Sequence, residues 1–269
     1  MSTKLIAAAA VTLMAAAPTA LRAQHHHHDH PHLHVDHSVE ECSVRFSSRL
    51  TQASFHRFVR EFGSVSAFKQ AGSPTGLRKG QLSIGIEQMT FTIDDHADAW
   101  NDTFAHPDEH HALGSRQQFP KIKLAAGVTD DLEVGAFWTR NLKANYGWLG
   151  IDAKYRPFTQ EDGRPVSLAL RGAYTKTLYV RDMDMHALTT DVSIERKLWR
   201  GIRAYGGVGA DAVYARETTD SVRLNDEAIV ASHAFAGAAV TLLGRVDVGA
   251  EFTLGARPSM QLQVAARVF

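Results

Sequence analysis

The chain has few cysteines, few prolines and no excess of charge of either sign. Cys42 is the single cysteine, so no disulfide can form within the chain. Eight prolines and 22% charged residues among 269 argue against a chain that is disordered throughout. Lys plus Arg number 29 and Asp plus Glu number 29, so no global electrostatic field favours nucleic acid or an acidic surface as a partner.

Signature motifs of the common enzyme classes are also missing. The sequence has no Gly-x-Ser-x-Gly, no His-Glu-x-x-His and no phosphate-binding glycine loop followed by Lys. The only histidines in the predicted strands, His186 and His233, have no nucleophile beside them in sequence. We therefore expect a protein that is not an enzyme, with a membrane-embedded hydrolase as the least favoured alternative.

Beyond the N-terminus, no apolar run is long enough for a membrane helix. Residues 5–17 are apolar and follow Lys4, and Pro18, Thr19 and the short stretch Ala20-Leu21-Arg22-Ala23 come next. This order is typical of a secretory signal peptide over 1–23, cleaved after Ala23, and it predicts export. The alternative is an uncleaved anchor.

Residues 24–37 form a histidine-rich tract, and we expect residues 24–46 to be disordered, because this composition cannot form a core. Four further histidines lie in a polar, acidic stretch between residues 94 and 115. Neutral imidazole binds Zn, Cu and Ni well, and carboxylates can complete a site. The predicted metal ligands are His25, His26, His27, His28, His30, His32, His34, His37, His96, His106, His110 and His111. The alternatives are low complexity without function for the tract and an ordinary acidic surface loop for 94–115.

The next segment has helical periodicity. Phe55, Phe58, Val59 and Phe62 fall at i, i+3, i+4 and i+7, which predicts an amphipathic helix over 47–69. With its linker it occupies residues 47–79, and we expect it to plug the barrel at the periplasmic mouth. A peripheral helix on the membrane surface is the alternative.

Residues 80–269 change to a period of two, which predicts an antiparallel transmembrane β-barrel of about ten strands, an all-β fold. The predicted strands are 80–93, 116–129, 131–141, 145–157, 165–180, 184–197, 202–216, 227–243, 245–255 and 259–269. The first strand changes phase between Ile86 and Met89, which suggests a bulge. A soluble β-sandwich with the same number of strands is the alternative.

Short and long connections alternate along these strands, as in bacterial outer-membrane barrels. With both barrel termini periplasmic, the loop 94–115 lies outside the cell. The histidine tract would then be periplasmic, so that the two histidine-rich segments form separate sites on opposite sides of the membrane.

Aromatic residues near the strand ends suit membrane interfaces. They are Trp138, Tyr146, Tyr155, Phe158, Tyr174, Tyr179, Tyr205 and Tyr214. The terminal Phe269 resembles the assembly signal of outer-membrane barrels, although it is out of phase with the apolar residues before it. The expected partners are outer-membrane lipids, the barrel-assembly machinery and transition-metal ions, with no nucleic acid.

The predicted inward face of the strands is rich in charge of both signs. It carries Lys121, Lys123, Lys154, Arg156, Arg171, Arg203 and Arg267, and also Glu133, Asp152, Asp191, Glu195, Asp211, Asp247 and Glu251. Barrels of this size have little free lumen, and unpaired buried charges are costly. We expect structural ion pairs that fill the lumen, or a narrow polar conduit gated by them.

Several glycine-rich motifs resemble an uncharacterised family of proteobacterial outer-membrane β-barrels. They are GQLSIGIE at 80–87, NYGWLGIDAKY at 145–155, LRGAYTK at 170–176 and YGGVG at 205–209, together with the run from Leu50 to Gly63. The similarity covers residues 48–269. It implies the fold and the bacterial outer membrane, and it carries no catalytic residues to transfer. The expected role is binding, structural support or narrow passage, and a channel or transporter for a small solute or metal ion is the alternative.

Overall fold

The computed structural model describes residues 43–67, 76–105, 114–141, 146–199 and 201–268. The chain divides into two units, Met1–Asp36 and His37–Phe269, and all the described elements belong to the second unit. The predicted signal peptide, the histidine tract, the loop residues 106–113 and Phe269 lie outside the described residues. Within the segment predicted to be disordered, Ser43 and Val44 form a strand.

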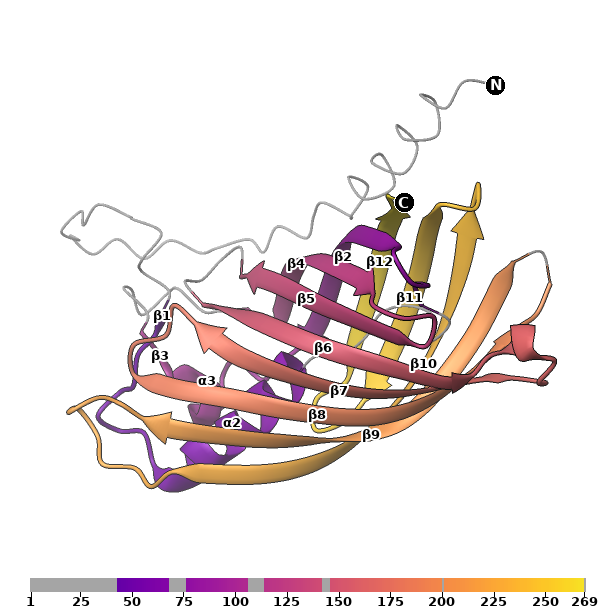
Figure 1. The fold of residues 1–269 in the computed structure, drawn as a ribbon. Coiled ribbons are helices and arrows are strands. Elements are labelled where there is room, and N and C mark those ends of the chain that lie inside the picture. Colours follow the sequence, from indigo (N-terminus) through magenta and orange to yellow (C-terminus); the bar gives the residue numbers. More distant parts are fainter. Residues whose placement is uncertain (1–42, 68–75, 106–113, 142–145, 200, 269) are drawn as a thin grey trace, which may run out of the picture. The chain divides into compact units, whose positions relative to one another are not determined.

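Ten strands form a closed antiparallel barrel (Figure 1). They are β2 (Leu82–Thr92), β4 (Arg116–Gly127), β5 (Leu132–Arg140), β6 (Gly147–Phe158), β7 (Ser167–Leu178), β8 (Met183–Lys197), β9 (Ile202–Glu217), β10 (Glu227–Leu242), β11 (Val246–Leu254) and β12 (Ser259–Arg267). Each pairs with its sequence neighbour in the barrel, and β12 pairs with β2 to close it. The predicted fold class and strand number are confirmed.

The two ends of the barrel differ. The turn end holds the beginning of β2, the end of β12 and the connections 128–131, 159–166, 198–201 and 243–245. The loop end holds the connections 93–115, 141–146, 179–182, 218–226 and 255–258. A single 3-10 turn, η1 (Gln160–Asp162), lies at the turn end.

Outside the barrel strands, two helices and a two-stranded sheet lie at the loop end. Helix α2 (Gln52–Ser66) begins at Thr51, whose side chain accepts a hydrogen bond from the amide of Ser54. Within the connection 93–115 lie helix α3 (Asp98–Asn101) and strand β3 (Phe104–Ala105), which pairs with β1 (Ser43–Val44). Among the described residues, no helix has the length and apolar character needed to span a membrane.

The barrel is apolar outside and charged inside, the reverse of a soluble protein. On β6, Leu149, Ile151 and Tyr155 are exposed, whereas the intervening Asp152 and Lys154 are buried. Other strands repeat this pattern, with exposed residues such as Ile84, Ile122, Leu188, Val208 and Phe252. Water would disfavour so large an apolar surface, so the exterior fits the hydrocarbon of a membrane.

Strand β2 contains no bulge, so that prediction is wrong. It pairs with β4 and β12 in continuous register from Ser83 to Phe91. Ile84 and Ile86 point outward, whereas Met89 and Phe91 point inward near the loop end of the barrel. The apolar residues change face because the interior becomes apolar at that end. Among the described barrel strands, the pairing of β6 with β7 shifts register between Tyr155 and Phe158, next to Pro157.

Two of the predicted interface aromatics face inward instead. Tyr146 is fully buried in the aromatic cluster at the loop end, and Tyr205 is buried beside Gly237. Trp138, Tyr155, Tyr174, Tyr179 and Tyr214 are exposed on the outer side as expected. Position near a strand end is therefore insufficient to distinguish an interface residue from one that packs inside.

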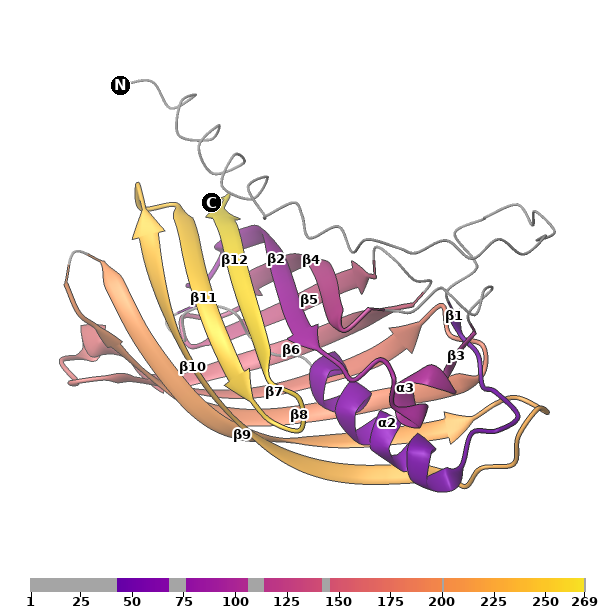
Figure 2. The same cartoon turned by 180° about the vertical axis from the view of Figure 1, so that it is seen from behind.

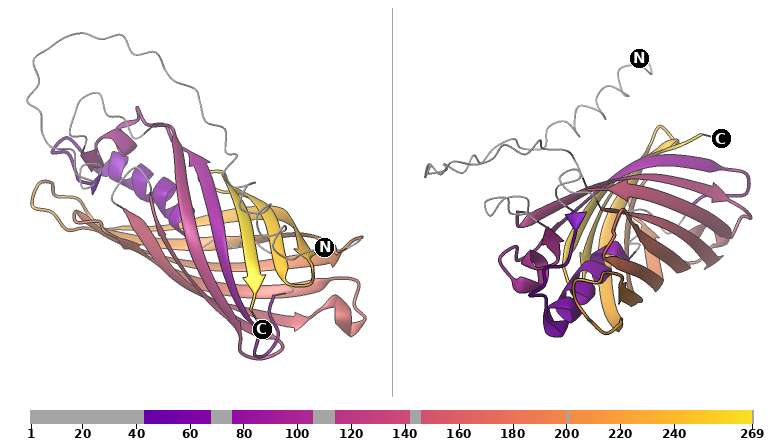
Figure 3. Two further views of the ribbon diagram at one scale, coloured as in Figure 1. Left: turned by 90° about the horizontal axis from the view of Figure 1, so that it is seen from above. Right: turned by 90° about the vertical axis from the view of Figure 1, so that its left-hand side faces the viewer.

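Helix α2 lies at the loop end, opposite the predicted position at the end that holds the barrel termini. It packs on β8, β9, β10 and α3, and the C-terminus of β12 lies at the far end (Figures 2 and 3). Strands β8, β9 and β10 have 15, 16 and 16 residues, whereas β11 and β12 have nine each. The longer strands therefore extend past the shorter ones at the loop end, and α2 lies against this extension.

Candidate functional site: the barrel interior

The loop end of the interior is closed by an aromatic layer. Phe55, Phe58, Val59 and Phe62 of α2 are fully buried. The ring centroid of Phe62 lies 5.6 Å from that of Tyr146, the residue directly before β6, and 5.5 Å from that of Trp148, near the start of β6. Further rings complete the layer: Phe91, Phe119, Trp100 and Phe104. The helical period found in the sequence therefore buries its apolar face against the inner wall of the barrel.

Glu61 connects α2 to two other elements. Its Oε2 accepts hydrogen bonds from Trp100 Nε1 at 2.6 Å and from Arg257 Nη2 at 2.7 Å, and its Oε1 accepts one from Arg57 Nε at 2.9 Å. Burial alone would raise the pKa of Glu61, but the hydrogen bonds from Trp100, Arg57 and Arg257 outweigh it and hold the pKa below its ordinary value. Glu61 is therefore a charged anchor between α2, α3 and the connection between β11 and β12.

The other edge of α2 is anchored to β10 and the loop before it. The side-chain oxygen of Gln52 accepts a hydrogen bond from the Asn225 backbone amide at 2.8 Å. The side-chain amide of Gln52 donates one to the Asn225 carbonyl oxygen at 3.2 Å. His56 Nδ1 lies 2.7 Å from Glu227 Oε2. On this evidence α2 is a docked element held by polar contacts on both sides, and not a loose surface helix.

The middle of the interior is a network of buried charges. Lys121 Nζ lies 2.9 Å from Glu87 Oε1 and 3.2 Å from Gln261 Oε1. Arg171 on β7 pairs with Asp191 on β8 through its Nε at 3.0 Å and also through Nη2. The strand alternation places all of these side chains on the inner face.

A buried histidine pairs with an aspartate in the same region. His233 Nδ1 on β10 lies 3.0 Å from Asp211 Oδ2 on β9, and Thr189 on β8 donates a hydrogen bond to Asp211 Oδ1 at 3.0 Å. Sequence reasoning missed this pair, because His233 and Asp211 are adjacent only through the strand register. A carboxylate that fixes a histidine tautomer occurs in hydrolases, but the arrangement here also satisfies three buried polar groups without any reaction.

Charged side chains also hold the N-terminal segment at the turn end. Glu133 pairs with Lys154 at 2.9 Å and accepts a hydrogen bond from the amide of Leu77 at 2.6 Å. Arg156 donates to the carbonyl oxygens of Leu77 and Asp130. The cavity left in this region measures about 60 Å³ and is lined by Gly76, Lys123, Glu133 and Asp247 among others. That volume is enough for a few water molecules at most.

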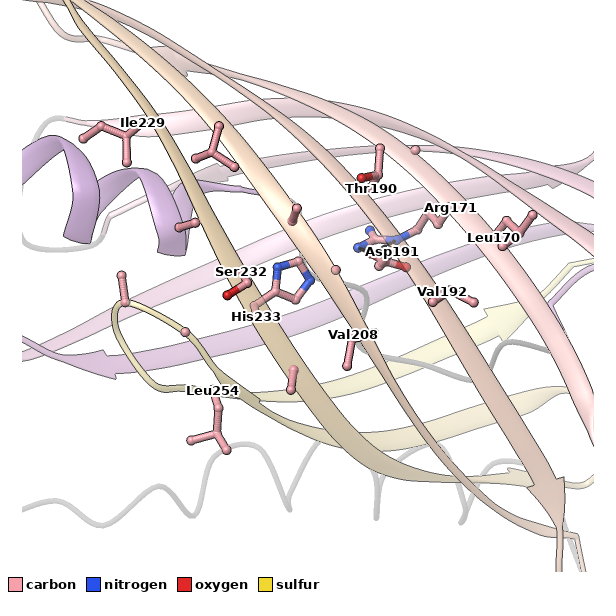
Figure 4. Close-up of a pocket in the computed structure, with 18 of the residues that line it drawn as sticks. Leu170, Arg171, Thr190, Asp191, Val192, Val208, Ile229, Ser232, His233 and Leu254 are labelled. Carbon is pink, nitrogen blue, oxygen red and sulfur yellow. Dashed lines mark hydrogen bonds and ion pairs between the residues drawn. The ribbon is translucent and has the colours of Figure 1, made fainter.

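A larger recess of about 1730 Å³ follows the barrel wall from β5 to β11 (Figure 4). Its lining includes exposed apolar residues such as Leu170, Val208 and Leu254, and it reaches His56 and Arg60 on the exposed side of α2. The lining also includes the buried inner-face residues Arg171, Asp191 and His233.

The structure describes one of the predicted metal ligands, His96, which lies exposed in the turn before α3. Among the described residues, no group of three or more His, Cys, Asp or Glu side chains is arranged to hold a metal ion. The other predicted ligands, in the tract and at 106–111, lie outside the described part of the chain. The metal prediction is therefore neither supported nor contradicted by the described geometry.

The predicted inward charges do face inward. Twelve of the fourteen are buried, and Asp247 and Arg267 are partly exposed at the turn end, where they pair at 2.9 Å. Glu87 is an additional buried acid that sequence reasoning missed, because the assumed bulge in β2 obscured which face it occupies. Continuous alternation from Ser83 would have identified it.

Together these features define the class of protein: a transmembrane β-barrel with an apolar exterior and a charged interior. No family model matches the chain, and no curated protein matches it. The resemblance to a proteobacterial barrel family therefore stays a prediction at the level of the family.

Solved structures similar to this chain are membrane barrels. They include an outer membrane channel from Pseudomonas putida F1, with 10% identity over 74% of this chain and 100% of that chain and a TM-score of 0.46. Neisserial surface protein A shares 11% identity over 70% and 96% of the two chains, with a TM-score of 0.32. The attachment invasion locus protein of Yersinia pestis shares 10% over 70% and 97%, with a TM-score of 0.31. The likenesses are weak, so the architecture rests on the geometry described above.

Proposed function

We propose that this protein is a bacterial outer-membrane barrel without catalytic activity that serves as a narrow passage, closed in the conformation described here. The apolar exterior and the closed strand order support the membrane assignment, since a closed barrel leaves no strand edge unpaired in lipid. The predicted signal peptide agrees with export to that membrane. With the barrel termini periplasmic, the loop end and α2 face outward.

The observation that carries the proposed closure is the position of the N-terminal segment. Ala67, directly after α2, is buried in the core at the loop end, and Leu77 is bound by Glu133 and Arg156 at the turn end. The chain thus occupies the interior near both mouths before β2 begins. Paired charges in the middle, such as Lys121 with Glu87, reduce the free space further. In this proposal the lumen is largely filled, and solute passes only when α2 leaves its place.

Undocking α2 tests this proposal. The double variant Phe58→Ala and Phe62→Ala removes two fully buried rings from the aromatic layer, each worth about 3–5 kcal/mol in a packed core. We expect the variant, reconstituted into planar lipid bilayers, to conduct ions at least severalfold more often than the parent protein. The control is Phe252→Ala, which removes a ring of the same kind from the lipid-facing side.

Retention of the barrel is checked by the migration of unheated samples on gels. A second variant, Arg257→Ala, removes one bond to Glu61 without entering the aromatic layer, and we expect a smaller increase in conductance. Folded double variants that conduct no more than the parent would show that α2 does not close the passage.

We also propose transition-metal binding by the histidine-rich segments, with Zn, Cu or Ni as the ion. Ser43 pairs with Ala105 of the loop 94–115, so the segment before α2 and this loop meet at the same end of the barrel. This placement differs from the prediction that the segment before α2 lies at the opposite end from the loop 94–115.

Metal titration of three forms of the protein tests this idea. They are the mature chain, the chain without residues 24–37, and the chain with His106, His110 and His111 replaced by Ala. Metal binding by both segments predicts that each change lowers metal uptake and that binding weakens as pH falls through the imidazole pKa of about 6.5. Equal uptake by all three forms would remove the metal role.

A further inference from the structure

The pairing of the barrel strands stops short along part of β10. This strand pairs with β9 along residues 227–240, but with β11 only along residues 234–242. Among the described residues, 227–233 therefore have a neighbouring strand on one side only. The difference arises because β10 has 16 residues and β11 has nine, so that β11 ends, at Leu254, opposite Ala234. We call residues 227–233 the free edge of β10.

The free edge lies at the depth of the membrane. Tyr214, an exposed aromatic residue on the outer side of β9, pairs with Ala228 and marks the membrane interface at the loop end. Val208, near the middle of β9, pairs with Ala234, where the pairing of β10 with β11 begins. The free edge therefore extends from the interface toward the middle of the membrane. Unpaired backbone groups are strongly unfavourable in hydrocarbon, so polar groups have to meet this edge.

The recess of about 1730 Å³ passes around the free edge (Figure 4). Part of its lining is His56 and Arg60 of α2, the helix that packs inside the loop end of the barrel. Another part is the outward, exposed residues Val208 and Val230. A cavity that contacts both a helix inside the barrel and side chains on the outer wall has to pass the edge of that wall. The recess is therefore a lateral opening between the membrane and the interior.

On the outer wall, the recess continues as a groove across the strands. Its floor is a row of short side chains that pair with one another from strand to strand: Ala153, Gly172, Thr190, Ala210 and Ser232. Along its turn-end side runs a second such row, of larger apolar side chains: Tyr155, Leu170, Val192 and Val208. Because the floor is a single row of residues that leads to the free edge, the groove suits one extended hydrocarbon chain.

On the α2 side, the recess is lined by a free cation. Arg60 is exposed, and it has no hydrogen-bond or ion-pair partner within the described part of the chain. The acids Glu61 on α2 and Glu227 on β10 are both paired with other side chains. A guanidinium group binds a carboxylate through two parallel hydrogen bonds, and the amides of a free strand edge donate further ones. The α2 side of the recess therefore complements an anionic group, and its outer part complements an apolar chain.

We propose that the recess binds a long-chain fatty acid from the membrane, with its carboxylate at Arg60 and its acyl chain in the outer groove. This occupant supplies a polar group to the free edge and covers the floor of the groove with hydrocarbon. The recess is large enough, because ligand pockets measure about 300–1,000 Å³. The site goes beyond the passage proposed above and does not depend on it, since the recess is open while α2 is docked.

The test uses palmitic acid with a photoreactive diazirine near the end of its chain, added to the purified full chain in phosphatidylcholine nanodiscs. We expect labelling that saturates and maps to residues of the groove. Arg60→Ala should lower the apparent affinity at least about tenfold, because a hydrogen-bonded ion pair is lost. The methyl ester of the probe, which has no charge, should bind the parent protein as weakly as the acid binds Arg60→Ala. The control is Arg223→Ala, an exposed arginine of the connection 218–226, which should leave the affinity unchanged.

Gly172→Leu tests the groove. Among the described residues, nothing lies within 4 Å of a Cβ built at Gly172, so leucine fills the floor without straining the barrel. Strand β7 lies three strand spacings, about 14 Å, from β10, so only a long chain reaches it. The substitution should lower the affinity for the palmitic probe severalfold and leave that for an octanoic probe of the same design unchanged. Ala250→Leu, on the exposed side of β11 and outside the recess, should change neither.

Two results would overturn the inference. One is labelling that does not saturate, or that either Arg60→Ala or Gly172→Leu leaves unchanged. The other is a dimer cross-linked along β10 that excludes the probe, which would assign the free edge to a second copy of the chain. Saturable labelling that depends on Arg60, in a barrel whose Phe58→Ala and Phe62→Ala double variant does not conduct, would refute the passage and support the fatty acid site.

Discussion

At the scale of single residues, Glu61 has the clearest predicted effect. It is a buried carboxylate that accepts bonds from Trp100, Arg57 and Arg257, which belong to three different parts of the loop end. Asp94 also lies near this site, with its Oδ2 3.7 Å from Arg57 Nη2. Glu61 was not singled out by sequence, because its partners lie 39 and 196 residues away along the chain.

The lowered pKa of Glu61 makes the docking of α2 depend on pH. Because the pKa of Glu61 is lower in the docked state than its ordinary value of 4.5, the ionised carboxylate stabilises docking at every pH above 4.5. This contribution is lost as the pH falls through the lowered pKa. We therefore expect α2 to stay docked near neutral pH and to loosen as the pH falls below 4.5 and through the lowered pKa of Glu61. The fluorescence of Trp100, measured as the difference from Trp100→Phe, should report this loosening.

The Glu61→Gln variant is the control for this titration. It removes the charge and weakens the bonds to Arg57 and Arg257, at a cost of about 2 kcal/mol to docking. Its Trp100 signal should lie closer to the undocked state at neutral pH and should change little with acid. An unaltered acid transition in Glu61→Gln would assign the pH dependence to another group.

At the scale of elements, the sequence predicted which segments form strands and what faces the core, but not where the helix docks. Alternation alone identified ten strands, because each strand of a membrane barrel must place apolar residues on one side only. The period of Phe55, Phe58 and Phe62 likewise identified α2. Its location at the loop end could not follow from that period, because it depends on the extra length of β8, β9 and β10 relative to β11 and β12.

Two errors in the sequence interpretation have a common cause. A bulge was expected in β2 from the change of phase, and an interface role was expected for Tyr146 from its position near a strand end; neither prediction took account of an apolar region inside the barrel. The interior instead becomes aromatic where α2 docks, so Met89, Phe91 and Tyr146 face inward there. A change from polar to apolar residues along one face of a strand therefore indicates either an element docked on that face or a break in register.

At the scale of the whole molecule, the account depends on a barrel that spans a membrane with its apolar side outward. Val208 lies near the middle of β9 and is 57% exposed, whereas Ile202, at the start of the same strand, is 41% exposed. In a membrane barrel, an arginine on the lipid-facing side costs about 2–4 kcal/mol at the midplane and about 0–1 kcal/mol near the interface. In water, arginine at either position would be tolerated.

The most direct measurement is the unfolding free energy of Val208→Arg and Ile202→Arg in lipid vesicles, obtained by denaturant titration. The account predicts that Val208→Arg loses about 2–4 kcal/mol relative to the parent and that Ile202→Arg loses less than about 1 kcal/mol. Equal, small losses at both positions, in a protein that stays folded without lipid or detergent, would contradict the membrane-spanning barrel on which the proposed passage depends.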